Sequence, residues 1–168
     1  MTLLRALDAP DASPAFIYVS ADGSSQRISR ADFHTGAGAW AARLAELPPG
    51  AVIILAGLPI PQTMLAFWGA LWRGVVPAIL PPLTEKLDPA IYWERLGALI
   101  DHSGARAVLT GADFAPDLRA RSPVPVLVPD DTPPGAPPPI HTPAPDDIAF
   151  LQHSSGTTGL QKGVALAH

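Results

Sequence analysis

Cysteine is absent from the 168-residue sequence, and its absence excludes three kinds of chemistry. A chain without thiols has no disulfide framework, no thiolate zinc site and no cysteine nucleophile. Because structural disulfides belong to oxidising compartments, this composition fits a reducing one, and we expect the protein to be cytoplasmic.

Charge is also scarce, since charged residues make up 15% of the sequence and no cluster of lysine or arginine occurs in it. The 11 basic and 15 acidic residues leave a formal net charge of −4. Nucleic-acid binding requires basic side chains gathered on one surface to neutralise phosphates. We therefore do not expect nucleic acid as a partner.

No apolar run is long enough for a membrane-spanning helix, which needs about 20 mostly apolar residues. The most apolar region, residues 51–83, is interrupted by Pro59, Pro61 and Arg73. The first ten residues include an arginine and an aspartate and lack the apolar core of a signal peptide. With 48% hydrophobic residues, the chain can still bury a sizeable core, so we expect a globular protein without membrane insertion.

Two hydrophobic periodicities alternate along the chain. Short runs rich in Val, Ile and Leu predict strands, and apolar residues at helical spacing predict helices. Ser29 with Asp32 three residues later predicts a capped helix start, and Gly74 and Gly104 predict helix ends. The predicted strands are 15–20 and 26–29 as a hairpin, then 51–55, 75–80, 107–110, 124–128 and 148–152, and the predicted helices are 29–47, 62–73 and 91–102. This order predicts an α/β fold with a three-layer, mainly parallel sheet flanked by helices.

Proline is concentrated in one stretch, because ten of the 21 prolines lie between residues 123 and 145. Such a composition favours an extended, semi-rigid connection on the surface. We therefore divide the chain into an α/β subdomain, residues 1–122, a Pro-rich connection, residues 123–147, and a strand-loop-strand motif, residues 148–168.

The segment 154–164 directly follows the last predicted apolar strand and has the composition of a phosphate-binding loop. Glycines let the backbone approach a ligand closely, so that successive N–H groups can converge on phosphate oxygens. Hydroxyl groups add hydrogen bonds, and a lysine adds a positive charge. The residues of this kind are Ser154, Ser155, Gly156, Thr157, Thr158, Gly159, Lys162 and Gly163.

The loop differs from the common ATP-binding P-loop, which has the form G-x-x-x-x-G-K-[ST] and opens a helix. Here Lys162 is followed by Gly163, and residues 164–166 are apolar and predict a returning strand. The predicted context is strand, loop, strand.

This loop resembles the signature of the adenylate-forming superfamily, which comprises acyl-CoA synthetases, fatty acyl-AMP ligases, luciferases and peptide-synthetase adenylation domains. Their loop is approximately [ST]-S-G-[ST]-T-G-x-P-K-G-V, and residues 154–164 match every fixed position except Gln161, which replaces proline. His168 also stands where such families often have a histidine. Weaker similarities of order and spacing run from Pro49 to Arg106. The resemblance implies the N-terminal subdomain of an adenylate-forming enzyme.

The resemblance further implies a two-step reaction. A carboxylate attacks the α-phosphorus of ATP to give acyl-AMP and pyrophosphate, and a thiol of CoA or of a carrier protein's pantetheine then takes the acyl group. By this analogy Thr157 and Thr158, with the backbone of Gly156 and Gly159, hold the β- and γ-phosphates. Lys162 is the expected catalytic residue, stabilising charge on the departing pyrophosphate, and Mg²⁺ is expected beside it.

The other working parts of such enzymes lie downstream of this loop: a magnesium-binding glutamate, a ribose-binding aspartate and a catalytic lysine of the C-terminal domain. The sequence contains none of them, so we expect an N-terminal fragment that is inactive by itself and able to self-associate through its uncovered strand. A fatty or other organic acid is favoured as substrate over an amino acid, on the resemblance of residues 81–82, Tyr92, Arg95 and 151–152 to acyl-AMP ligases. The alternatives are a non-catalytic folding or interaction module and an amino-acid adenylation fragment.

Three other patterns have structural explanations. Residues 36–41 mimic a glycine-rich dinucleotide fingerprint but lie inside a predicted helix, so helix packing explains them. His153 and Ser154 suggest a nucleophile and its base, yet neighbours in a strand point to opposite faces. The remaining histidines, His34, His102 and His141, show no metal-ligand spacing, and no metal site within the chain is expected.

Overall fold

A computed structural model describes residues 2–85, 87–129, 135–153 and 163–168 of the chain. Its centre is a six-stranded sheet in the order β6-β5-β3-β4-β7-β8. All neighbouring strands run parallel except β7 and β8, which are antiparallel. The strands are β3 (Val52–Leu55), β4 (Val76–Ile79), β5 (Ala107–Leu109), β6 (Val126–Leu127), β7 (Ile148–His153) and β8 (Gly163–Ala167).

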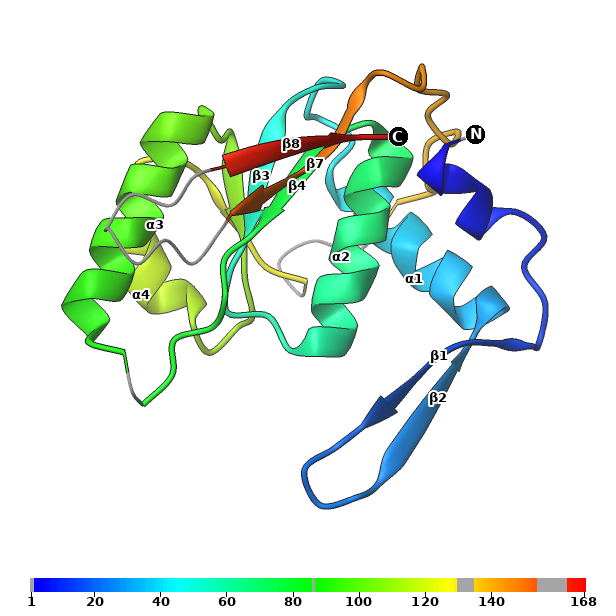
Figure 1. Cartoon of the computed structure of the whole chain (residues 1–168), viewed down its shortest axis with the longest axis horizontal. Helices are drawn as coiled ribbons and strands as arrows, with labels where there is room; N and C mark the ends of the chain where they lie inside the picture. The colour runs from blue at the N-terminus through cyan, green and yellow to red at the C-terminus, as the bar shows by residue number, and fades with distance from the viewer. Residues whose placement is uncertain (1, 86, 130–134, 154–162) are drawn as a thin grey trace.

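Helices cover both faces of this sheet (Figure 1). The longer ones are α1 (Arg30–Arg43), α2 (Ile60–Arg73) and α3 (Pro89–Ser103). On one face, Ile53 and Leu55 of β3 pack with residues of α2, and Trp40 of α1 joins the same cluster. On the other face, Ile54 of β3 packs with α3. The predicted three-layer α/β architecture is therefore confirmed.

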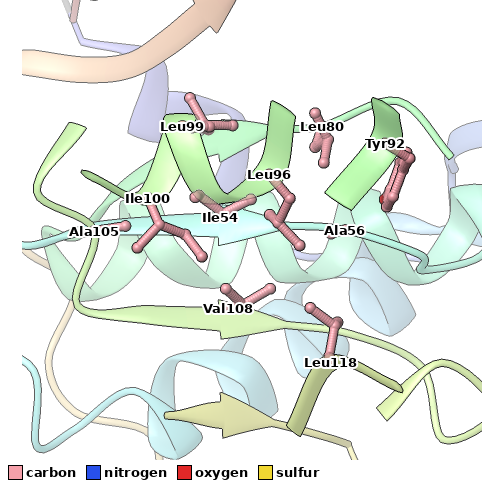
Figure 2. Packing of buried hydrophobic residues seen from close by; sticks show 11 residues of the cluster. Ile54, Ala56, Leu80, Tyr92, Leu96, Leu99, Ile100, Ala105, Val108 and Leu118 are labelled. Carbon is pink, nitrogen blue, oxygen red and sulfur yellow. The ribbon is translucent and has the colours of Figure 1, made fainter. Parts of the chain in front are cut away.

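The α3 face is a dry apolar core. Leu96, Leu99 and Ile100 of α3 lie over Ile54 of β3 and Val108 of β5 (Figure 2). Each of these side chains is at most 5% exposed, so fully burying one of them contributes about 1.5–3 kcal/mol relative to leaving it in water. This core fixes the strands whose ends carry the candidate site.

Helices α1 and α2 cross at unusually short range. A β-carbon on Gly69 of α2 would lie 2.7 Å from the carbonyl oxygen of Ala37 in α1 and would overlap the β-carbon of Trp40. A β-carbon on Gly36 would lie 2.8 Å from Leu65. The small residues in 36–39 therefore serve helix packing, as predicted.

The N-terminal hairpin also follows its prediction, with β1 (Pro14–Val19) antiparallel to β2 (Ser25–Ser29). Ser29 caps α1, since its Oγ accepts a hydrogen bond from the Asp32 N–H at 3.0 Å. The ring of Phe16 meets that of Phe33 edge to face and joins the hairpin to α1.

The Pro-rich stretch is held against α2. The indole Nε1 of Trp72 donates to the carbonyl oxygen of Pro138 at 2.7 Å, and the His141 N–H donates to the carbonyl oxygen of Trp72 at 2.8 Å. Gly74, which ends α2 with a φ of 78°, faces the His141 ring. The described part of the connection, residues 135–147, is thus fixed at several points.

Two short helices were not predicted: η1 (Leu3–Leu7) and α4 (Ala115–Arg119). In addition, α2 begins at Ile60, whereas the sequence predicted a turn up to Pro61. Proline is compatible with the first helical turn because the N–H it lacks has no partner there.

Candidate functional site

The carboxyl ends of β3, β4, β5 and β7 meet at one edge of the sheet, because these strands run parallel. After β3 the chain enters α2 on one face, and after β4 it enters α3 on the other. Ligands of open α/β sheets bind outside the carboxyl ends of the strands, where neighbouring connections leave in opposite directions. β7 lies beside β4 and ends with His153 at this edge.

The predicted loop is mounted between two paired strands. His153 at the end of β7 pairs with Gly163 at the start of β8, and Gln152 pairs with Val164. The two residues that flank the segment 154–162, His153 and Gly163, therefore form one cross-strand pair. β8 is a strand rather than a helix, which confirms the strand context that separates this loop from a P-loop.

Of the predicted phosphate ligands, the structure describes only Gly163. Ser154, Ser155, Gly156, Thr157, Thr158, Gly159 and Lys162, together with Gln161, lie outside the described residues.

Gly163 lies against the ring of His153. A β-carbon at this position would be 3.1 Å from the His153 Nε2, which is closer than ordinary contact. Gly163 has no positive φ, so the absent side chain rather than the backbone conformation explains the glycine. The close contact at the base of the loop is thus between Gly163 and the imidazole of His153.

His153 is a neutral group at the base of the loop. Its Nδ1 is buried and has no hydrogen-bond partner among the described residues. Burial lowers the pKa of His153 below its usual 6.5, and the nearby His102 lowers it further. At neutral pH the ring therefore adds no positive charge beside the loop.

Two further hydroxyl groups, those of Tyr92 and Thr110, are buried without a partner in the described structure. Burial raises the pKa of Tyr92 to about 12. Tyr92 is 1% exposed, and its ring meets those of Trp93 and Phe114 in the core. The structure therefore places Tyr92 in the packing of α3.

His168 lies at the opposite end of the β7–β8 pair from the loop, since Ala167 pairs with Ile148. It borders a cavity of about 470 Å³ that also includes His141, Asp146 and Asp147. Burial and His141 lower the pKa of His168, while Asp147 acts in the opposite direction. Sequence reasoning missed this cavity because its residues come from separate segments.

Asp147 has a structural role at the start of β7. Its Oδ2 accepts from the Ala144 N–H at 2.8 Å, and its carbonyl oxygen accepts from the His168 N–H at 3.1 Å. Asp147 thereby fixes the turn into β7 and the end of β8.

Among the described residues, no group of three or more His, Asp or Glu side chains is arranged to hold a metal ion. No helix in the same part of the chain is long and apolar enough to cross a membrane.

Fold and sequence together define an α/β protein with a glycine-rich segment between two antiparallel strands. Comparison with known families makes this class specific. The chain belongs to the AMP-binding enzyme family, whose model matches residues 5–168.

Two curated relatives show how the similarity extends. The chain is 31% identical to the inactive atromentin synthetase invA6 of Paxillus involutus over 92% of this chain and 17% of that protein. It is 32% identical to the long-chain-fatty-acid–AMP ligase FadD32 of Mycolicibacterium smegmatis over 88% of this chain and 24% of that protein. The chain thus spans less than a quarter of the length of these two relatives.

Among solved structures, the chain is similar to one from a study of fatty acyl-adenylate ligases of E. coli and L. pneumophila. The TM-score is 0.85 at 24% identity, over 99% of this chain and 32% of that one. The fold is therefore that of the N-terminal subdomain of adenylate-forming enzymes.

Proposed function

We propose that this chain supplies the phosphate-binding part of an ATP-dependent ligase that activates a carboxylic acid as acyl-AMP and releases pyrophosphate. One observation carries the proposal: the sequence 154–164 matches the adenylate-forming signature, and it follows β7, which ends at the carboxyl edge of the sheet and pairs with β8. Membership of the AMP-binding family supports it.

In this proposal the loop residues act as hydrogen-bond donors to phosphate oxygens. Thr157 and Thr158, with the backbone of Gly156 and Gly159, hold the β- and γ-phosphates. Ser154, Ser155 and Gly163 complete the loop. Mg²⁺, when bound, would neutralise part of the triphosphate charge.

Lys162 has the central role in the proposed chemistry. Its ammonium group stabilises the negative charge that pyrophosphate gains as the bond to the α-phosphorus breaks. Because His153 is neutral, Lys162 is the positively charged side chain that this part of the sequence offers to the phosphates.

We propose a fatty or other organic acid as the substrate class and a thiol, of CoA or of a carrier protein, as the acyl acceptor. The name of the Mycolicibacterium relative, a long-chain-fatty-acid–AMP ligase, supports the acid. The adenylate-forming resemblance supports the thiol.

The role of Lys162 is testable in the 168-residue chain by pyrophosphate binding, measured by isothermal titration calorimetry. The sequence has only two lysines, so Lys86→Ala is a matched control for Lys162→Ala. A hydrogen bond to a charged group contributes about 1.5–3 kcal/mol, so Lys162→Ala should weaken binding roughly 10- to 100-fold while Lys86→Ala leaves it unchanged. Equal binding by wild type and Lys162→Ala would refute the role.

ATP–pyrophosphate exchange with a panel of carboxylic acids tests the reaction itself. We expect exchange from the full-length ligase with one class of acid, and none from the 168-residue chain alone. Exchange by that chain alone would show that the loop subdomain is sufficient, contrary to the proposal.

A second candidate function is a non-catalytic module, favoured by the relative that is named an inactive synthetase. That function predicts no exchange from the full-length protein with any acid.

A further inference from the structure

Most side chains of β8 specify its register against β7 only weakly. Its sequence, GVALA, places the small residues Gly163, Ala165 and Ala167 on one face and the aliphatic residues Val164 and Leu166 on the other. A shift of β8 by two residues along β7 keeps every side chain on its own face, because side chains alternate with a period of two. After such a shift, small residues would still meet one face of β7 and aliphatic residues the other.

The cross-strand pair of His153 and Gly163 is different. The imidazole lies in the space that a side chain on Gly163 would need, since a β-carbon there would be 3.1 Å from the His153 Nε2 and 3.3 Å from its Cδ2. A ring that packs over a glycine is one of the features that fix the register of a sheet. This pair therefore carries register information that the rest of β8 lacks.

The same ring disfavours the shifted pairing. After a shift by two residues, Ala165 would stand opposite His153 in place of Gly163. Its methyl group would occupy the space that the imidazole fills, so the ring or the strand would have to move. Glycine at position 163 and alanine at position 165 together favour the observed register.

We propose that His153 is a positioning residue for the phosphate-binding segment: its ring, packed over Gly163, selects the register in which β8 follows that segment. This inference rests on the proposed function, because the register affects the chemistry only if residues 154–162 bind phosphate. A two-residue shift would move β8 by about 6.6–6.8 Å along β7. Hydrogen bonds act over about 2.7–3.2 Å, so Lys162, which directly precedes Gly163, would be displaced from its phosphate.

The His153 ring acts through its shape. Its Nε2 faces Gly163, and its Nδ1 is buried without a hydrogen-bond partner among the described residues. Packing therefore explains the position of the ring. A phenylalanine ring is also planar and should replace it in this role, whereas alanine would leave the space over Gly163 empty.

Pairs of introduced cysteines report the register without any ligand, because the sequence has no cysteine. Gln152→Cys and Val164→Cys are directly paired in the observed register. Gln152→Cys and Leu166→Cys would be directly paired only after the two-residue shift. In the observed register the β-carbons of this second pair are diagonal neighbours about 7 Å apart, which is too far for a disulfide.

With His153 present, mild oxidation should link residue 152 to residue 164 and should not link it to residue 166. His153→Ala should slow the first link about tenfold and allow the second, while His153→Phe should leave both as in wild type. His102→Ala is the matched control, because it removes an exposed imidazole close to His153. Identical linking in His153→Ala and in the chain that keeps His153 would overturn the proposal.

Binding of inorganic pyrophosphate, measured by isothermal titration calorimetry, tests the consequence for the proposed site. His153→Ala and Gly163→Ala should each weaken binding about tenfold, and His153→Phe should bind as tightly as wild type. The double alanine variant should be no weaker than either single variant, because residues in contact have non-additive effects. Effects that multiply to about a hundredfold, or weak binding by His153→Phe, would overturn the positioning role.

Failure of this inference and failure of the proposed function give different results. If wild type binds no pyrophosphate, the proposed function fails, and the cysteine pairs still show whether His153 selects the register. If His153→Ala binds pyrophosphate as tightly as wild type, the proposed function stands and this inference fails. His153→Phe keeps the test decisive even if the alanine variant is unstable.

Discussion

Replacing Gly69 by alanine tests how closely α1 and α2 are packed. The new β-carbon would lie 2.7 Å from the Ala37 carbonyl oxygen and 3.0 Å from the Ala41 nitrogen, and it would overlap the β-carbon of Trp40. These neighbours are backbone atoms or a β-carbon, so no rotamer change relieves the overlap. The helices must separate.

The expected magnitude follows from two opposing terms. Overpacking of a close core site costs about 1–3 kcal/mol and occasionally more. Alanine gains about 1 kcal/mol over glycine in a helix interior. Because three fixed atoms are overlapped here, we expect an overpacking cost at the upper end of that range, about 3 kcal/mol, and after the helix-propensity gain a net loss of about 2 kcal/mol.

Gly97 in α3 is the matched control, since no atom lies within 4 Å of a β-carbon there. Gly97→Ala should stabilise the protein by about 0.5–1 kcal/mol through helix propensity alone. Urea unfolding followed by tryptophan fluorescence measures both variants. Gly69→Ala as stable as wild type would refute the close packing of α1 on α2, and a destabilised Gly97→Ala would refute the propensity argument.

Two further predictions concern pH and the Pro-rich segment. The pKa values of His153 and His168 are lowered on folding from 6.5, so the unfolded chain binds more protons below that pH. Their contribution to the free energy of unfolding is complete above pH 6.5 and is lost as the pH falls through 6.5 towards the folded pKa values. Urea unfolding at several pH values should show that the double variant, with both histidines replaced by glutamine, loses less stability than wild type as the pH falls. An equal dependence of stability on pH in variant and wild type would contradict this. Trp72→Phe removes the 2.7 Å hydrogen bond to the Pro138 carbonyl oxygen and should lower the free energy of unfolding by about 1 kcal/mol. Amide hydrogen exchange in residues 135–143 should become faster. Unchanged exchange would show that other contacts hold the segment.

Local signals predicted the elements well. Ser29 and Asp32 form the expected cap, and Gly74 and Gly104 end α2 and α3 in the left-handed conformation. The predicted start of α2 was two residues too late, because proline is compatible both with a turn and with the first turn of a helix. Such signals are carried by neighbouring residues and need no tertiary context.

What remained hidden depends on contacts between distant segments. The sequence gives no sign that β5 crosses to the far side of β3, which sets the sheet order. Nor does it show that Trp72 holds residue 138, or that His141 and His168 border one cavity. Each of these features arises when segments far apart in the chain pack together, so no local sequence pattern predicts it.

The run of small residues in α1 shows that one sequence pattern can meet two unrelated structural requirements. A nucleotide fold uses glycine so that a pyrophosphate can approach the backbone. Here Gly36 leaves room for Leu65, and a β-carbon on Gly38 would lie 3.3 Å from Trp72. In both cases glycine is needed because it has no side chain, and the neighbour that fills the space, a ligand or another helix, distinguishes the two.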